Sequence, residues 1–156
     1  MREEDLMKMA VDIAYENVIS NSGGPFGAII VKNGKIIGVG KNQVTSTNDP
    51  TAHAEIQAIR AACQYLDSFQ LTDCELYTSC EPCPMCLGAI YWSRLKTIYY
   101  NCTKKDAAQI GFDDQFIYDQ LALPMEKRSI PMIELLPNST NSPFEAWKVS
   151  NQKKEY

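Results

Sequence analysis

The chain has 156 residues, 45% of them hydrophobic and 22% charged, and this suits one globular domain whose core can fold without disulfides. Lysine and arginine total 15 against 19 for aspartate and glutamate, so the net charge of −4 gives no global attraction for nucleic acid and favours small neutral substrates. No apolar run approaches the roughly 18 residues of a membrane span, so no membrane partner is expected.

The first part of the chain predicts a helix followed by a hairpin. Apolar residues recur at helical spacing from Leu6 to Val18, and the run Asn21 to Pro25 ends the pattern. Two segments rich in Ile and Val, Phe26 to Lys32 and Lys35 to Gly40, then predict strands. Between them, Asn33-Gly34 is typical of a two-residue type I′ turn, so the sheet is expected to begin with an antiparallel pair.

The middle of the chain predicts alternating helices and strands. After a polar loop at Lys41 to Asn48, Asp49 can cap a helix that has Pro50 at its first position and runs to about Tyr65. The next three elements are expected to be a strand at Cys74 to Ser79, a helix at Pro84 to Ser93 and a strand at Thr97 to Asn101. This βαβαβ order predicts parallel pairing.

The last third has a weaker pattern. A short helix is expected within Asp106 to Pro124, with a loop at Gly111-Phe112-Asp113-Asp114. Ile130 to Leu136 predicts a final strand. Ser142-Pro143-Phe144-Glu145 forms a capping box that opens a helix running toward Lys154.

Two separated motifs predict a single metal site. The only histidine lies in His53-Ala54-Glu55, and two thiols lie in Pro82-Cys83-Pro84-Met85-Cys86. An imidazole and two thiolates suit zinc, and three protein ligands leave a fourth tetrahedral position open for water, as in catalytic sites. Zinc lowers the pKa of such a water to about 7, and Glu55 is placed to transfer its proton.

The other cysteines have two interpretations. Cys80 lies close enough in sequence to Cys83 to complete a closed structural site of three cysteines and one histidine. We expect instead that Cys80 is not a ligand and that Cys63, Cys74 and Cys102 are small buried residues. An acidic start without an apolar signal core makes a reducing, cytoplasmic location the expectation for this cysteine-rich chain.

At the two metal motifs the chain resembles the cytidine and deoxycytidylate deaminase superfamily, whose signature is H-x-E followed by P-C-x-x-C. Further blocks resemble its guanine deaminase branch: Gly24-Pro25-Phe26-Gly27-Ala28, Asn48 to Glu55, Thr78 to Cys83, Gly111 to Asp114 and Lys153-Lys154-Glu155-Tyr156. The resemblance implies a three-layer α/β/α fold with a mixed five-stranded sheet. It also implies one zinc per subunit and a homodimer in which the C-terminal segment is swapped, so that its tail closes the partner's site.

The resemblance also implies which residues take part in catalysis. His53, Cys83 and Cys86 become the zinc ligands, Glu55 the main proton carrier and Asp114 a second acid. A loop aspartate in solvent is the alternative for Asp114.

Other residues are candidates for holding the substrate. Asn42 matches a position whose carboxamide holds a base edge, although it could instead cap a turn. Phe26, Trp92 and Tyr156 could surround a flat ring, although the first two could equally belong to the core. The backbone amides of Ala54 and Cys83, near helix starts, could bind a substrate oxygen.

Together these features predict that residues 1–156 form a single zinc-dependent domain that hydrolyses guanine, a small purine base, to xanthine and ammonia. A tRNA adenosine deaminase is the nearest alternative, although the basic residues of the tail are only Lys148, Lys153 and Lys154. Deamination of cytosine, another base or a nucleoside is a second enzymatic alternative. A structural zinc module without turnover is the non-enzymatic one.

Overall fold

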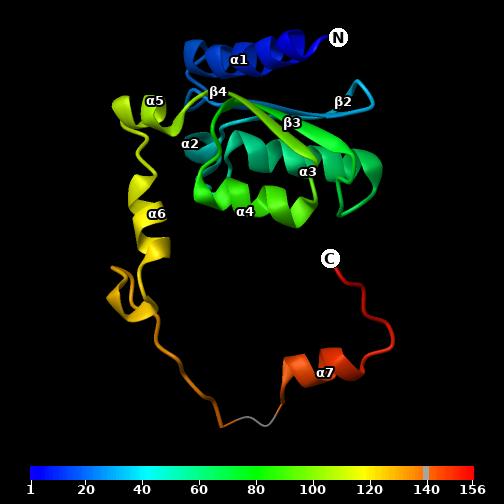
Figure 1. Cartoon of the computed structure of the whole chain (residues 1–156), viewed down its shortest axis with the longest axis vertical. Helices are drawn as coiled ribbons and strands as arrows, with labels where there is room; N and C mark the ends of the chain where they lie inside the picture. The colour runs from blue at the N-terminus through cyan, green and yellow to red at the C-terminus, as the bar shows by residue number, and fades with distance from the viewer. Residues whose placement is uncertain (139–140) are drawn as a thin grey trace.

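The computed structural model describes residues 1–138 and 141–156, and its centre is a sheet with strand order β2-β1-β3-β4. The strands are β1 (Gly27–Lys32), β2 (Lys35–Lys41), β3 (Cys74–Cys80) and β4 (Thr97–Cys102). Helix α1 (Glu3–Ile19) covers one face, and α3 (Ala54–Leu66) and α4 (Pro84–Ser93) cover the other (Figure 1). The three-layer α/β/α arrangement is therefore confirmed.

The sheet is mixed, and the predicted hairpin opens it. Asn33 and Gly34 have φ values of 50° and 75°, as a type I′ turn requires. Strand β1 pairs antiparallel with both β2 and β3, whereas β3 and β4 are parallel. The expected parallel pairing thus holds only for β3 and β4, because the hairpin places β1 between β2 and β3.

Strand β1 is buried on both faces and separates two apolar clusters. Ala28 and Ile30 pack toward α3, whereas Ile29 and Val31 pack toward α1, as the alternation of side chains along a strand dictates. On β2, a Cβ added to Gly40 would lie 2.0 Å from the carbonyl oxygen of Ala54. Glycine therefore lets the start of α3 approach the sheet closely.

The predicted start of α3 was wrong. The helix begins at Ala54 and His53 is its N-cap residue, while the loop before it contains a short helix, α2 (Val44–Thr47). Asp49 closes a turn instead, because its Oδ1 accepts hydrogen bonds from the Thr51 N–H at 2.9 Å and the Thr51 hydroxyl at 2.7 Å. With its carboxylate satisfied locally, Asp49 does not cap the helix.

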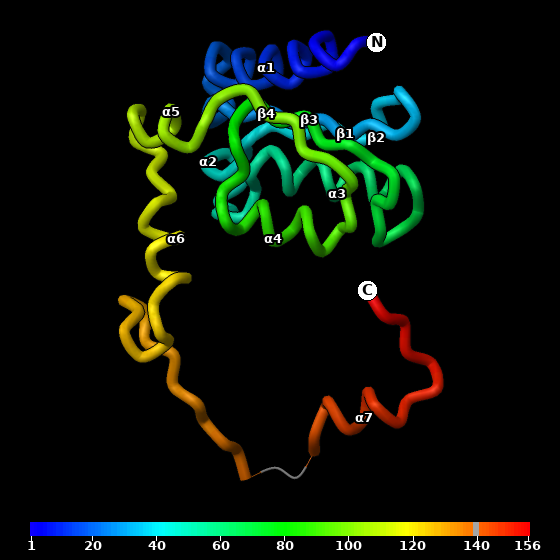
Figure 2. The backbone as a smooth tube through the Cα atoms, in the orientation of Figure 1, coloured from blue at the N-terminus to red at the C-terminus, as the bar shows by residue number. Residues whose placement is uncertain are grey.

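The C-terminal third leaves the sheet. After β4 come α5 (Lys104–Gln109), α6 (Gln115–Ala122), a 3₁₀ turn (Met125–Lys127) and α7 (Pro143–Val149). The backbone trace runs down from α5 through α6 and then away from the layered core before it returns at the C-terminus (Figure 2). Within the described residues, no helix is long and apolar enough to cross a membrane.

Two predictions for this third were wrong. Ile130–Leu136 forms no strand, so the sheet of the described chain has four strands, not five; Ile133 and Leu135 are 79% and 84% exposed, with no neighbouring strand to pair with. The last helix starts as predicted, since the Ser142 Oγ accepts a hydrogen bond from the Glu145 N–H at 3.3 Å. It ends at Val149, however, rather than running toward Lys154.

Candidate zinc site and active-site cavity

The two metal motifs meet where α3 and α4 begin. His53 and Cys83 are the N-cap residues of these helices, and Cys86 lies in the first turn of α4. The His53 Nδ1 is 3.5 Å from the sulfurs of both Cys83 and Cys86. Because His53 has extended backbone angles (φ −71°, ψ 157°), His53 and Glu55 avoid the divergence of residues two apart within a helix.

The donor set fits zinc. The candidate ligand atoms of His53, Cys83 and Cys86 all lie within 4.8 Å of one another. A side-chain hydrogen bond from Cys86 lowers the pKa of Cys83 to about 4 despite the opposing effect of burial, and His53 also lowers it. The hydrogen bond to Cys83 and burial raise the pKa of Cys86, so Cys86 would give up its proton on binding the metal. One nitrogen and two sulfur donors then suit a three-ligand zinc site.

Cys80 does not join this group. Its sulfur lies 3.6 Å from the carbonyl oxygen of Thr103, and burial raises the pKa of its thiol to about 12. All six cysteines are free thiols, and Cys74 is buried as expected. Cys63 is only partly buried, and the expectation for Cys102 was wrong because it lies exposed at the end of the edge strand β4.

Glu55 lies beside the zinc ligands in a nearly closed environment. It is 5% exposed, and burial raises the pKa of its carboxyl. The Thr78 hydroxyl, on β3, donates a hydrogen bond to Oε1 at 2.9 Å, and the Cys86 thiol donates to Oε2 at 3.3 Å. These contacts hold the carboxyl in one orientation, and its raised pKa makes it a better proton acceptor than an exposed glutamate.

A cavity of about 550 Å³ opens over these groups, which is a common size for a small-molecule site. Its wall combines candidate zinc ligands, four acidic residues and several apolar side chains. The lining residues are Gly24, Phe26, Asn42, Val44, Thr45, Pro50, His53, Glu55, Cys80, Glu81, Cys83, Met85, Lys104, Ala107, Gly111, Phe112, Asp113, Asp114 and Ile117. The structure thus brings His53, Glu55 and Cys83 together with Phe26, Asn42 and Asp114.

One side of the cavity presents an aromatic ring and an amide. Phe26 meets Phe112 edge to face, with ring centroids 5.0 Å apart. Asn42 is 7% exposed, and its Oδ1 accepts a hydrogen bond from the Val44 N–H at 3.2 Å. Asn42 therefore supports the local turn and lines the cavity at the same time.

Asp114 also lines the cavity. It is the N-cap residue of α6, but its side chain makes no capping hydrogen bond. Burial raises the pKa of its carboxyl, and the negative charges of Cys83 and Glu81 act in the same direction, whereas Lys104 opposes them. It is thus half-buried in the cavity wall rather than a loop aspartate in free solvent.

Three predicted substrate residues are not brought to the cavity wall of their own chain. Trp92, in α4, and Tyr156 contact each other, with ring centroids 5.8 Å apart. They are 62% and 70% exposed, and the lining residues include neither. Ala54 is fully buried behind the wall between His53 and Glu55.

Sequence reasoning missed two supporting residues. The Thr78 hydroxyl donates a hydrogen bond to Glu55. The only sequence feature that could have indicated this role is that Thr78 begins the block Thr78 to Cys83, which resembles guanine deaminases. Asn17, in α1, is 2% exposed, and its Nδ2 donates to the carbonyl oxygens of Gly24 at 2.8 Å and Asn42 at 2.9 Å. A buried polar residue within an otherwise amphipathic helix was the signal for Asn17.

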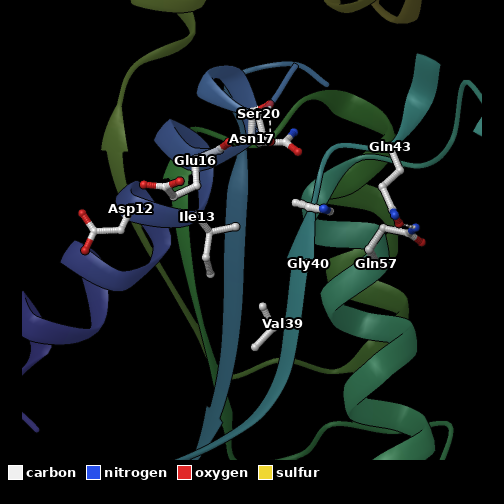
Figure 3. A pocket seen from close by; sticks show the side chains of 10 residues that line it. Asp12, Ile13, Glu16, Asn17, Ser20, Val39, Gly40, Gln43 and Gln57 are labelled. Atoms are coloured by element: carbon white, nitrogen blue, oxygen red, sulfur yellow. Dashed lines mark hydrogen bonds between the residues drawn. The ribbon is translucent and has the colours of Figure 1, made fainter. Parts of the chain in front are cut away.

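Asn17 also contributes to a second cavity, of about 570 Å³, between α1, β2 and the start of α3 (Figure 3). Acidic side chains of α1, Asp12 and Glu16, line one side, and Gln43 and Gln57 line the other. Asn17 thus lies between this cavity and the backbone of Asn42. None of the candidate zinc ligands lines this second cavity.

The fold and the three-ligand site are those of a zinc-binding deaminase. Residues 1–102 match the family described as the cytidine and deoxycytidylate deaminase zinc-binding region, and the chain belongs to this family. Over all 156 residues it is 55% identical to the guanine deaminase of Bacillus subtilis, with both chains covered completely. The solved structure of that enzyme has a TM-score of 0.96, covering 100% of this chain and 99% of the other.

Two further relatives match over a shorter length. A tRNA-specific adenosine deaminase of Buchnera aphidicola is 44% identical over 111 residues, which are 71% of this chain and 73% of that protein. A solved relative described in complex with 2,6-diaminopurine is 35% identical, has a TM-score of 0.67 and covers 70% of this chain and 61% of its own.

Proposed function

We propose that this protein catalyses the zinc-dependent hydrolysis of guanine to xanthine and ammonia. The observation that carries the proposal is the 55% identity to a guanine deaminase over the complete chain, including the C-terminal third. The similarity to the tRNA-specific adenosine deaminase covers only 71% of the chain. A neutral purine base also suits a small cavity in a chain of net charge −4.

His53, Cys83 and Cys86 would hold the zinc ion. When bound there, zinc supplies the Lewis acidity that makes water nucleophilic at neutral pH. Glu55 accepts a proton from the attacking water and passes it to ring nitrogen N3 as the water oxygen bonds to C2. It then accepts the proton of the new C2 hydroxyl and passes it to the amine; the C2–N bond breaks as C2=O forms, and ammonia leaves.

Asp114 acts as a second acid from the opposite wall. Guanine carries its amine at C2, so a carboxyl facing Glu55 across the ring can bond to the ring edge or assist the amine as it leaves. The support is its half-buried position in the cavity wall and the raised pKa of its carboxyl. Both features favour the protonated carboxyl that a general acid requires.

The remaining walls orient the base. Phe26 packs against the flat ring, while the Asn42 carboxamide bonds to its polar edge. The backbone N–H groups of Ala54 and Cys83, near helix starts, bind the substrate oxygen; such groups lack partners within the helix. The support is that Phe26, Asn42 and Cys83 line the same cavity.

We further propose that residues 1–156 act as one domain in a homodimer with swapped C-terminal segments. Ile130, Ile133, Leu135 and Leu136 are between 77% and 84% exposed, which is unusual for a run of large apolar residues in an isolated subunit. Strand β4 has an open edge in the described chain. Pairing this segment with the partner's sheet would cover both, and Tyr156 and Trp92 would then complete a site shared between subunits.

A cytoplasmic location remains part of the proposal, because six free thiols suit a reducing compartment.

The test is ammonia release by the zinc-loaded protein from guanine, with cytosine, adenine, guanosine, cytidine and a tRNA anticodon stem-loop in parallel. We expect turnover of guanine at least 100-fold faster than of the other substrates. Preferential turnover of the stem-loop would assign the protein to the tRNA adenosine deaminases. Absence of turnover with every substrate would leave a structural zinc module.

A further inference from the structure

Helix α6 carries Asp114 at its N-terminus but lies away from the sheet. Figure 1 shows α6 below α5, to one side of the three layers. Among the described residues, no extensive packing joins α6 to the strands or to α1, α3 and α4. The position of Asp114 over the cavity therefore depends on a few local contacts.

Tyr118 makes the contacts that link α6 to the zinc-ligand loop. Its hydroxyl donates a hydrogen bond to the carbonyl oxygen of Pro82 at 3.4 Å, and Pro82 directly precedes Cys83. The Lys104 Nζ lies 4.3 Å from the centre of the Tyr118 ring, and the Lys104 N–H donates to the Glu81 Oε1 at 3.4 Å. Tyr118 thus contacts Pro82 directly and Lys104 at the start of α5, and Lys104 links it in turn to Glu81.

Tyr118 and Asp114 also share one side of α6. They are four residues apart, so their side chains lie one helical turn from each other, and the Tyr118 N–H donates to the Asp114 carbonyl oxygen at 3.3 Å. Both are partly buried, whereas their neighbours Gln115, Phe116 and Ile117 are exposed. A contact that holds Tyr118 against the loop consequently also sets the direction of Asp114.

We propose that Tyr118 is a positioning residue that holds Asp114 over the active-site cavity through its bond to Pro82. The inference rests on the proposed role of Asp114 in guanine deamination. It assigns Tyr118 no contact with the substrate. The hydroxyl acts by fixing the N-terminus of α6 relative to the candidate zinc ligands.

The test uses Tyr118→Phe, which keeps the ring and its contact with Lys104 but removes the hydroxyl. We expect kcat for guanine to fall about threefold to tenfold, the range for one lost hydrogen bond, with KM changed less than about twofold. In an Asp114→Asn background, Tyr118→Phe should change kcat by less than about 1.5-fold. Tyr15→Phe, at an exposed position of α1, is the matched control and should behave as wild type.

A second measurement does not depend on turnover. Hydrogen exchange of peptides covering residues 115–122 should accelerate in Tyr118→Phe, whereas peptides from α1 and α3 should be unchanged. Equal effects of Tyr118→Phe in the wild-type and Asp114→Asn backgrounds would overturn the inference, as would unchanged exchange in α6. Absence of guanine turnover in the wild type would reject the proposed function, whereas an active wild type with an unaffected Tyr118→Phe would reject only the role of Tyr118.

Discussion

At the scale of single residues, the chemistry of the cavity depends on how burial changes ordinary side chains. Glutamate is usually a surface residue, but Glu55 is only 5% exposed and accepts hydrogen bonds from Thr78 and Cys86. Burial raises the pKa of its carboxyl. The proposed proton transfers require this group to accept and release protons in turn. A neutral amide in its place would retain the shape of the side chain but not this ability.

Glu55→Gln should therefore retain zinc and lose at least about 100-fold in kcat, the effect typical of a general acid–base residue. Metal analysis and ammonia release by the same preparation measure the two quantities. Glu16→Gln, on the exposed side of α1, is the matched control. Turnover of Glu55→Gln within a few-fold of wild type would remove Glu55 from the proposed mechanism.

Cys80→Ser tests the closed-site alternative. The Cys80 sulfur faces the Thr103 carbonyl oxygen, and the cluster of candidate ligands contains only His53, Cys83 and Cys86. We expect this variant to keep one zinc per subunit and near-normal turnover, whereas Cys86→Ser should lose most of its zinc. Metal analysis after dialysis separates the two variants, and loss of zinc from Cys80→Ser would support the closed structural site.

At the scale of elements, the cavity is assembled from segments that are held by buried polar contacts. Asn17 extends from α1 and donates to the carbonyl oxygens of Gly24 and Asn42, both of which line the cavity. Its own Oδ1 is buried and has no hydrogen-bond partner in the described part of the chain. The side chain thus uses only its donor group, and a residue without that group cannot replace it.

Asn17→Asp should destabilise the fold, because a carboxylate cannot donate to the two carbonyl oxygens and would be buried beside them. We expect a loss of about 2 kcal/mol or more at neutral pH, measured by denaturant unfolding of the zinc-loaded protein. The KM for guanine should also rise, because the Asn42 backbone loses its support. Asn151→Asp, in the exposed tail, is the control, and equal stability of the two variants would contradict the role of Asn17.

At the scale of the whole molecule, the isolated subunit has features that a second subunit would explain. The C-terminal segment leaves the core (Figure 2). Its apolar residues are exposed, and Tyr156 is not among the residues that line the cavity of its own chain. In the proposed swapped dimer, each tail would close the site of the other subunit. Exclusion of water by that tail would then contribute to catalysis.

Deletion of Tyr156 should lower kcat/KM while leaving the unfolding temperature nearly unchanged. Coexpression offers a sharper test: Glu55→Gln has an intact tail but no proton carrier, and the Tyr156 deletion has an intact proton carrier but no tail. If tails serve the partner's site, mixed dimers should recover turnover above the weighted sum of the two parents. Activity equal to that sum would place the tail's contribution within its own subunit or remove it.

The agreement between sequence and structure was good wherever the decisive interactions are local. The Asn33-Gly34 turn and the helix at Pro84 to Ser93 were predicted with correct bounds, and the two hairpin strands to within one residue, because turn type and helix capping depend on neighbouring residues. The predicted start of α3 was too early, because an aspartate can either cap a helix or accept hydrogen bonds within a turn. Asp49 does the second, since its Oδ1 accepts both hydrogen bonds from Thr51. The strand predicted at Ile130 to Leu136 is absent because a strand needs a partner to pair with, and in the described chain this segment lies beside none.

The amino-acid sequence was sufficient to identify the zinc site, because one histidine and two cysteines that open a helix, with one glutamate beside them, have the ligand types and spacing of such a site. The folded chain was needed to show that Cys80 lies outside the ligand cluster, that Thr78 bonds to Glu55 and that Asn17 supports the cavity wall. It also shows that Trp92 and Tyr156 do not line the cavity of their own chain. Burial and direction of side chains arise from contacts between segments far apart in sequence, and no local pattern encodes them.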